Sequence, residues 1–127
     1  MPSINTLSPE KLARLIGRPD SPALIDVQTD EDFNADPRLV PGAVRKPWRT
    51  VTTWASEFRG RSAVVICRHG RKLSEGVAAW LRHAGVAAET LEGGALAWAA
   101  AGLPLVPEAK LRLNRSTSSR AGRSRRA

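Results

Sequence analysis

Short apolar, β-branched runs alternate along this chain with stretches in which apolar residues recur at helical spacing. Residues 23–27 (Ala-Leu-Ile-Asp-Val) and 63–66 (Ala-Val-Val-Ile) are the clearest strand-like runs, and a shorter one lies around residues 90–91. Parallel strands need a long crossover between them, and a helix is its usual form. The alternation therefore predicts an α/β fold, a parallel sheet with helices on its faces.

The expected helices carry start and stop signals. Ser8, Pro9 and Glu10 supply a capping hydroxyl, a proline at the first helical position and an acid beside the positive end of the helix dipole. Further helical segments are expected at residues 30–33, 48–58, 74–84 and 95–101. The segment 74–84 is expected to turn four side chains inward, those of Val77, Ala78, Trp80 and Leu81.

Charge divides the chain into two parts. Residues 108–127 hold seven Lys and Arg against one acid, a formal charge of +6, whereas residues 1–107 hold thirteen basic and eleven acidic residues, a charge of +2. We expect residues 1–107 to form one domain, because that length suffices for a single modest core. The tail, 108–127, has few apolar residues and is expected to be disordered, either as a solubilising extension or as a weak, non-specific contact to a polyanion.

Several functional classes are disfavoured by composition. No apolar run approaches the roughly 18 residues that span a bilayer, and the N-terminus lacks the features of a secretory signal. A single cysteine forms no internal disulfide, and no Cys/His cluster suggests zinc. We therefore expect a cytoplasmic protein that meets no membrane.

The only cysteine, Cys67, directly follows the run at 63–66 and precedes a basic, glycine-containing loop. A loop curling back over the sulfur directs backbone N–H groups at it, and the helix expected from Ser74 adds its positive end. Both favour a thiolate and an anionic substrate such as thiosulfate, a persulfide, phosphate or arsenate. The candidate site is Cys67 as nucleophile with seven substrate-binding residues: Arg68, His69, Gly70, Arg71, Lys72, Leu73 and Ser74.

Plainer roles exist for the same residues. A lone cysteine at a strand end is often a small packing residue, and His69 either tunes the thiolate or is a solvated loop side chain. Asp26 lies near the end of a strand-like run, where one role is to line the site. The other is to accept a hydrogen bond from loop backbone or to pair with a basic residue. We favour the second role for Asp26.

The order of these segments resembles the rhodanese family. Residues 23–27, with Val-Pro-Gly-Ala at 40–43, are similar to its N-terminal half, and residues 64–70 to its active-site strand and loop. Leu-Glu-Gly-Gly-Ala-Leu-Ala-Trp at 91–98 and Ala-Gly-Leu-Pro at 101–104 are similar to its C-terminal half. The resemblance covers roughly residues 5–107. It implies a five-stranded parallel sheet flanked by helices on both faces.

The same resemblance implies a reaction that needs no metal or organic cofactor. Cys67 would accept a sulfane sulfur from a small anionic donor, hold it as a persulfide and pass it to an external thiol, protein acceptor or cyanide. The backbone N–H groups from Arg68 to Ser74 would stabilise the sulfur, and Arg68, Arg71 or Lys72 would hold the oxyanion of the donor.

Two positions depart from the family pattern. Gln28 stands where an arginine usually follows the strand-end Asp-Val, and Ser74 comes seven residues after Cys67 instead of six. The longer loop is similar to that of the related cell-division-cycle phosphatases and arsenate reductases, which end it with an oxyanion-binding arginine, whereas this chain has Leu73. It is also loosely similar to rhodaneses that accompany chromate-resistance proteins. Such an oxyanion enzyme, or a catalytically inactive rhodanese-like binding module, is the alternative to a sulfurtransferase.

Overall fold

The computed structural model describes residues 5–108 of the chain. In chain order its elements are β1 (Thr6–Leu7), α1 (Pro9–Leu15), β2 (Ala23–Asp26), α2 (Asp30–Ala35), β3 (Arg38–Leu39), β4 (Val44–Arg45), η1 (Trp48–Thr50), α3 (Val51–Trp54), η2 (Ala55–Phe58), β5 (Ser62–Ile66), α4 (Lys72–His83), β6 (Ala87–Leu91), α5 (Gly94–Ala100) and β7 (Val106–Pro107). The elements η1 and η2 are short 3-10 helices that flank α3.

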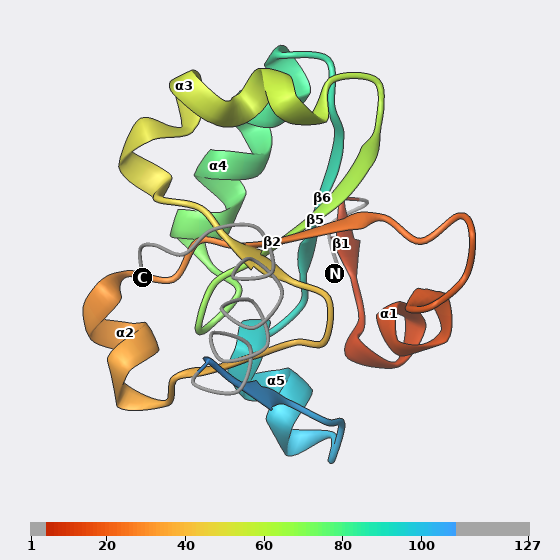
Figure 1. The fold of residues 1–127 in the computed structure, drawn as a ribbon, viewed down its shortest axis with the longest axis vertical. Coiled ribbons are helices and arrows are strands. Elements are labelled where there is room, and N and C mark those ends of the chain that lie inside the picture. The colour runs from red at the N-terminus through yellow and green to blue at the C-terminus, as the bar shows by residue number, and fades with distance from the viewer. Residues whose placement is uncertain (1–4, 109–127) are drawn as a thin grey trace, which may run out of the picture.

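Five strands form one parallel sheet in the order β1-β6-β5-β2-β4. Figure 1 shows β1, β6, β5 and β2 at the centre of the molecule. The expected five-stranded parallel sheet is therefore confirmed. Its central strand, β5, pairs with β2 and β6, so residues after β5 leave the sheet at its middle. A separate antiparallel pair joins β3 to β7.

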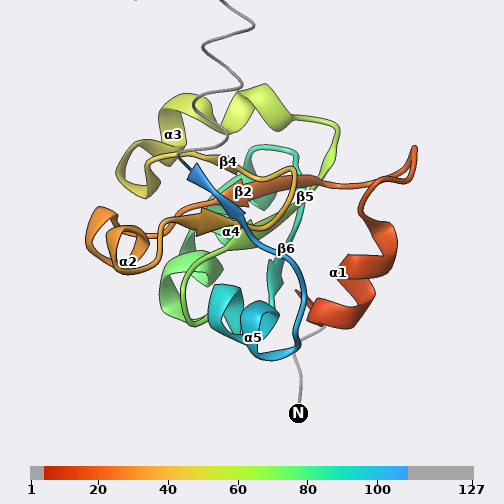
Figure 2. The same ribbon diagram turned by 60° about the horizontal axis from the view of Figure 1, so that its bottom comes forward.

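Helices cover both faces of this sheet, each over its own hydrophobic core. Side chains alternate between faces along a strand, and on β5 Ala63 and Val65 point to one face while Val64 and Ile66 point to the other. The first face packs against α3, η2 and α4, and the second against α1, α2 and α5. Figure 2 shows α3 and α5 on opposite sides of the strands. Cys67 continues the alternation and belongs to the first core.

Local signals placed the first helices correctly. The Ser8 hydroxyl accepts the Lys11 N–H at 3.2 Å and caps α1, with Pro9 as its first residue. Thr29 caps α2 in the same way, accepting the Asp32 N–H at 3.1 Å, and three acids occupy the first turn of that helix. The acidic helix expected at 30–33 is therefore present, and it extends to Ala35.

Three details differ from expectation, all around α4 and β6. The helix begins at Lys72, so Ser74 lies within its first turn and does not cap it. Trp80 was expected to face inward, but 53% of its surface is exposed. The short strand expected near residues 90–91 is the five-residue β6, because it pairs on both sides, with β5 and β1.

Two further expectations concern the basic tail and membrane-spanning helices. The basic tail falls outside the described residues, apart from Glu108. Across residues 5–108, every helix is too short or too polar to cross a bilayer.

Candidate active site

Cys67 stands at the carboxyl end of the central strand, with its side chain turned toward the core under α3 and α4. Only 5% of the residue is exposed, so the sulfur lies just below the surface. The neighbouring strand is anchored there, because the Val27 N–H donates to the Ile66 carbonyl at 2.8 Å. Ligand sites in parallel α/β sheets lie at this edge, beyond the carboxyl ends of the strands.

The sulfur lies within a cradle formed by its own loop and the start of α4. The Gly70 N–H donates to Cys67 Sγ at 3.1 Å, and Sγ lies 3.2 Å from Ser74 Oγ. Ser74 is fully buried and donates its hydroxyl proton to the Arg71 carbonyl at 3.1 Å. Its oxygen therefore accepts from the Cys67 thiol. The fold therefore brings Gly70 and Ser74 into contact with Cys67.

Two glycines let the loop fold back this tightly. Gly70 and Gly94 have φ values of +67° and +65°, in the left-handed region. A Cβ on Gly70 would lie 2.6 Å from the Gly94 nitrogen, and a Cβ on Gly94 would collide with the Cys67 carbonyl oxygen. The start of α5 also bonds this loop, since the Ala95 N–H donates to the Cys67 carbonyl at 2.9 Å. The loop therefore rests directly on backbone, with no room for a side chain between.

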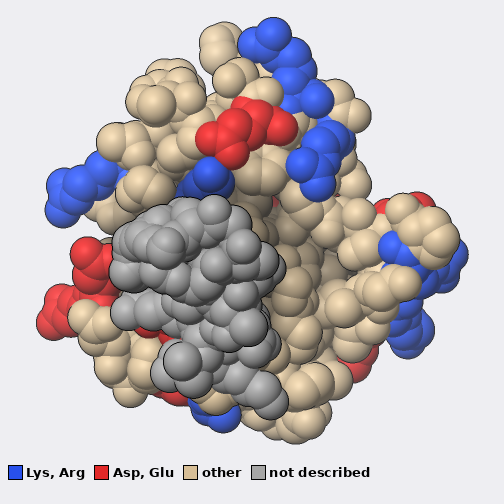
Figure 3. Space-filling view, viewed as in Figure 1, with Lys and Arg blue, Asp and Glu red and all other residues tan. Residues whose placement is uncertain are grey.

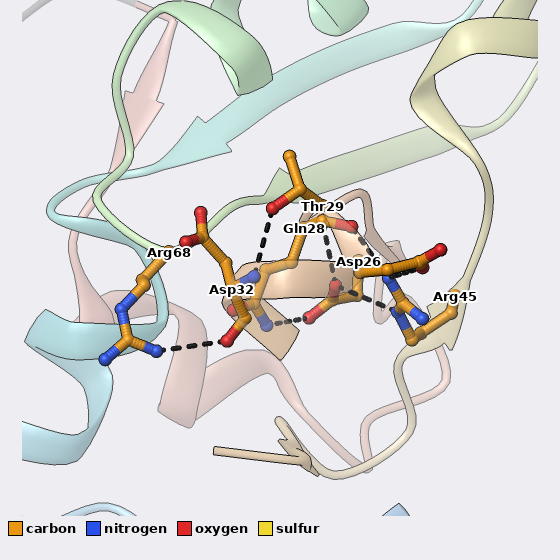
Figure 4. Close-up of polar contacts among 7 residues, drawn as sticks. Asp26, Gln28, Thr29, Asp32, Arg45 and Arg68 are labelled. Carbon is orange, nitrogen blue, oxygen red and sulfur yellow. Dashed lines mark hydrogen bonds and ion pairs between the residues drawn. The ribbon is translucent and has the colours of Figure 1, made fainter. Parts of the chain in front are cut away.

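The predicted basic residues point in different directions. Arg68 turns away to α2, where its Nη1 donates to the Asp32 carbonyl at 3.2 Å, as Figure 4 shows. His69, Arg71 and Lys72 are exposed on the loop and the first turn of α4. Leu73 is half-buried and packs against the core that contains Cys67. Arg71 and Lys72 are thus the exposed cations next to the cysteine, whereas Arg68 ties the loop to α2.

A buried carboxylate network lies beside the loop, at the ends of β2 and β4 (Figure 4). Asp26 is 1% exposed and accepts the Gln28 backbone N–H at 3.0 Å and the Gln28 side-chain amide at 2.9 Å. The guanidinium of Arg45 approaches the same carboxylate at 3.7 Å and donates to the Gln28 carbonyl at 2.7 Å. The favoured role of Asp26, bonding loop backbone and pairing with a basic residue, is confirmed.

Sequence reasoning missed Arg45. Its guanidinium also covers the Phe33 ring at 4.3 Å, so it joins β4 to α2 as well as to β2. Gln28 replaces the arginine that the family pattern places two residues after Asp26, and here the cation beside Asp26 comes from the adjacent strand. The register of β2 and β4 sets Asp26 opposite Arg45, and only this pairing shows that Arg45 supplies the cation.

Asp26→Asn and Asp36→Asn are expected to alter the pH dependence of stability in opposite directions. Burial raises the pKa of Asp26 above its ordinary 3.8 and outweighs the hydrogen bonds from Gln28, which lower it. The hydrogen bond from Arg38 lowers the pKa of Asp36. The contribution of Asp26 to the unfolding free energy therefore falls as pH rises from 3.8 through its folded-state pKa. That of Asp36 is present above 3.8 and is lost as pH falls through its folded-state pKa.

Urea denaturation of the protein and both variants, from about pH 3 to pH 7, measures this difference. The free-energy gap between the protein and the Asp26→Asn variant should shrink or reverse as pH rises. The gap to the Asp36→Asn variant should grow. Gaps that change in the same direction would contradict the contrast between a buried and an Arg-paired carboxylate.

The charges of the described surface are mixed. Figure 3 shows Lys and Arg side chains interspersed with acidic ones around one face, with broad uncharged areas between. Among residues 5–108, no three His, Cys, Asp or Glu side chains gather closely enough to hold a metal ion. The described site offers a thiol, backbone N–H groups, a hydroxyl and the exposed cations Arg71 and Lys72.

Comparison with known proteins identifies the family of this chain. The rhodanese-like domain matches residues 8–101, which is most of the chain. A protein named sulfurtransferase from Allochromatium vinosum is 26% identical over 104 residues, covering 81% of this chain and 95% of that protein. The chain belongs to the rhodanese-like family.

Solved structures agree on the fold. A thiosulfate sulfurtransferase from Pseudomonas aeruginosa matches with a TM-score of 0.68 and 26% identity, over 84% of this chain but only 20% of that longer one. A rhodanese-like domain protein from Staphylococcus aureus matches with a TM-score of 0.65 and 24% identity, over 75% of this chain and 91% of that one. These matches support the five-stranded sheet independently of the sequence motifs.

Proposed function

We propose that this protein is a sulfurtransferase that carries a sulfane sulfur from thiosulfate or a persulfide donor on Cys67 to a thiol or cyanide acceptor. The observation that carries the proposal is the cradle around the sulfur, with the Gly70 N–H 3.1 Å from Sγ at the N-terminus of α4. A single sulfur atom bearing negative charge suits such a cradle. The sulfurtransferase among the relatives and the thiosulfate sulfurtransferase among the solved structures support it.

In the first half-reaction the Cys67 thiolate attacks the outer sulfur of thiosulfate. A sulfur–sulfur bond forms to Sγ, the sulfur–sulfur bond of thiosulfate breaks, and sulfite leaves with the bonding electron pair. The opening N–H groups of α4 have no partner within the helix, and Arg71 and Lys72 lie beside them. These groups attract the anionic donor and stabilise the charge on the persulfide.

Ser74 adapts to the charge of Cys67. While Cys67 is a thiol, it donates a hydrogen bond to Ser74 Oγ, and the Ser74 hydroxyl donates to the Arg71 carbonyl. A thiolate has no proton to donate, so the hydroxyl turns and donates to Sγ instead. Ser74 and Gly70 then both donate to the charged sulfur, which lowers the free energy of the nucleophilic form.

In the second half-reaction the acceptor attacks the outer sulfur of the Cys67 persulfide. The bond to Sγ breaks, its electron pair returns to Cys67, and thiocyanate or an organic persulfide leaves. Cys67 is the only cysteine of the chain, so no internal thiol receives the sulfur. The enzyme ends unchanged in oxidation state and ready for another donor.

Turnover assays in parallel test the reaction class. We expect thiocyanate from thiosulfate and cyanide, and negligible hydrolysis of an aryl phosphate or thiol-dependent reduction of arsenate. Leu73 gives the reason, because it is half-buried against the core and offers no guanidinium to an oxyanion. Phosphate release or arsenate reduction without thiocyanate would favour the oxyanion enzyme. No product in any arm would favour a binding module.

A further inference from the structure

The C-terminal end of α2 exposes a backbone carbonyl to the cysteine loop. In a regular α-helix the Asp36 N–H would reach the Asp32 carbonyl, four residues back. Here it donates to the Phe33 carbonyl at 3.1 Å, so the last turn is tighter. The Asp32 carbonyl instead accepts Nη1 of Arg68 at 3.2 Å (Figure 4). A cation is favoured at this position, because the negative end of the helix dipole lies at the C-terminus.

The backbone of Arg68 is held by a second helix, α5. The Leu96 N–H donates to the Arg68 carbonyl at 3.0 Å, and the Ala95 N–H donates to the Cys67 carbonyl at 2.9 Å. The first N–H groups of a helix have no partner within it, so these two carbonyls satisfy them. Arg68 therefore joins two helices: its carbonyl is bonded to the start of α5, and its guanidinium to the end of α2.

The donor to the sulfur comes two residues after this junction. The Gly70 N–H lies 3.1 Å from Cys67 Sγ. A Cβ on Gly70 would lie 2.6 Å from both the Gly94 nitrogen and the Leu91 carbonyl oxygen, so β6 and the start of α5 support the loop closely there. Toward α2 the loop is held through the side chain of Arg68. Loss of that side chain would release the loop toward α2 and let the Gly70 N–H move off the sulfur.

The surroundings of the Arg68 guanidinium do not suit contact with a sulfur donor. It is engaged at the end of α2, and its charge contributes to the lowered pKa of Asp36, after the larger effect of the Arg38 hydrogen bond. Arg68 is also half-buried, whereas Arg71 and Lys72 are exposed. An arriving anion would therefore meet the exposed pair without displacing any bond described for Arg68.

We propose that Arg68 is a positioning residue, which joins the cysteine loop to α2 and thereby holds the Gly70 N–H on the sulfur of Cys67. The inference rests on the proposed sulfur transfer, and it gives Arg68 a role other than the donor contact that the family resemblance implies. Attraction of the donor depends on Arg71 and Lys72. The rate at which Cys67 attacks depends on the bond between Arg68 and α2.

Arg68→Gln and Arg71→Gln form a matched pair, because each removes one cation from the same loop. Amide hydrogen exchange at Gly70, followed by NMR, is expected to be about tenfold faster in Arg68→Gln and within about twofold of the unaltered protein in Arg71→Gln. In single-turnover loading with thiosulfate, Arg68→Gln should lower the maximal rate about tenfold and change the half-saturating concentration by less than about twofold. Arg71→Gln should instead raise the half-saturating concentration about threefold.

Arg68→Lys keeps a cation and N–H donors, so it should restore both the Gly70 exchange rate and the maximal loading rate to within about threefold. The amides of β5 are the reference for global folding and should exchange equally in all variants. A raised half-saturating concentration in Arg68→Gln with unchanged Gly70 exchange would mean that Arg68 holds the donor, and would overturn the positioning role.

The two proposals can fail separately. No loading by the unaltered protein would remove the sulfurtransferase assignment. Equal Gly70 exchange in the two glutamine variants would remove the positioning role of Arg68, whether or not the protein loads sulfur.

Discussion

Replacing Cys67 by serine is expected to abolish thiocyanate formation while leaving the fold intact. Serine is nearly isosteric and can keep the contacts of Cys67 with Ser74 and with the Gly70 N–H, so the free energy of unfolding should change by no more than about 1 kcal/mol. A serine hydroxyl forms no persulfide, so the rate should fall at least about a thousandfold. Steady-state assays and urea denaturation of the same preparation measure both quantities.

Ser74→Ala is the graded companion of that variant. It keeps the thiol but removes one donor to the charged sulfur, so a loss of about tenfold to a hundredfold in transfer rate is expected. A full rate in Cys67→Ser would end the assignment of the nucleophile. An unchanged rate in Ser74→Ala, with Cys67→Ser inactive, would leave Gly70 and α4 as the groups that stabilise the thiolate.

Gly94→Ala is expected to be the most disruptive small substitution at the site. The added Cβ would collide with the Cys67 carbonyl oxygen and lie 2.6 Å from the Arg68 oxygen, and the residue would keep a φ of +65°. Left-handed strain and displacement of packed backbone together should cost about 2–4 kcal/mol of stability. Because Gly94 supports the loop that aims the Gly70 N–H at Sγ, transfer should fall about a hundredfold.

Gly102→Ala supplies the matched control. Gly102 has a φ of +76°, but a Cβ there would meet no atom within 4 Å. That variant carries the left-handed strain without the collision, so it should lose about 1–2 kcal/mol and retain its activity. Thermal unfolding and initial rates of both variants decide the matter. Equal losses of activity would mean that the contact between Gly94 and the cysteine loop does not position Gly70.

The sequence was sufficient for the elements whose signals are local. The Ser8 cap, the acidic first turn of α2 and the apolar run of β5 act within a few residues, and each lies where it was expected. The position of Cys67 after β5 also follows from the chain alone, because a buried strand must release the chain at the edge of the sheet. The cradle partners Gly70 and Ser74 follow Cys67 closely in the chain, one in the loop and the other in the first turn of α4.

What the sequence could not predict depends on contacts between distant segments. Arg45 was overlooked because its partner Asp26 is set by the register of β2 and β4, which no local pattern encodes. Gly94 lies far along the chain from Cys67, and only the packing of α5 on the loop brings them together. Trp80 was misplaced because it follows Val77 by three residues, as an inward position would, but lies at the surface beside Trp48 and Gly76.

Intact-protein mass spectrometry after brief incubation with thiosulfate tests the central claim most directly. The account predicts a gain of one sulfur atom that maps to Cys67, is absent in Cys67→Ser and disappears when cyanide is added. No gain by protein whose Cys67 is still alkylated by iodoacetamide would contradict the persulfide mechanism.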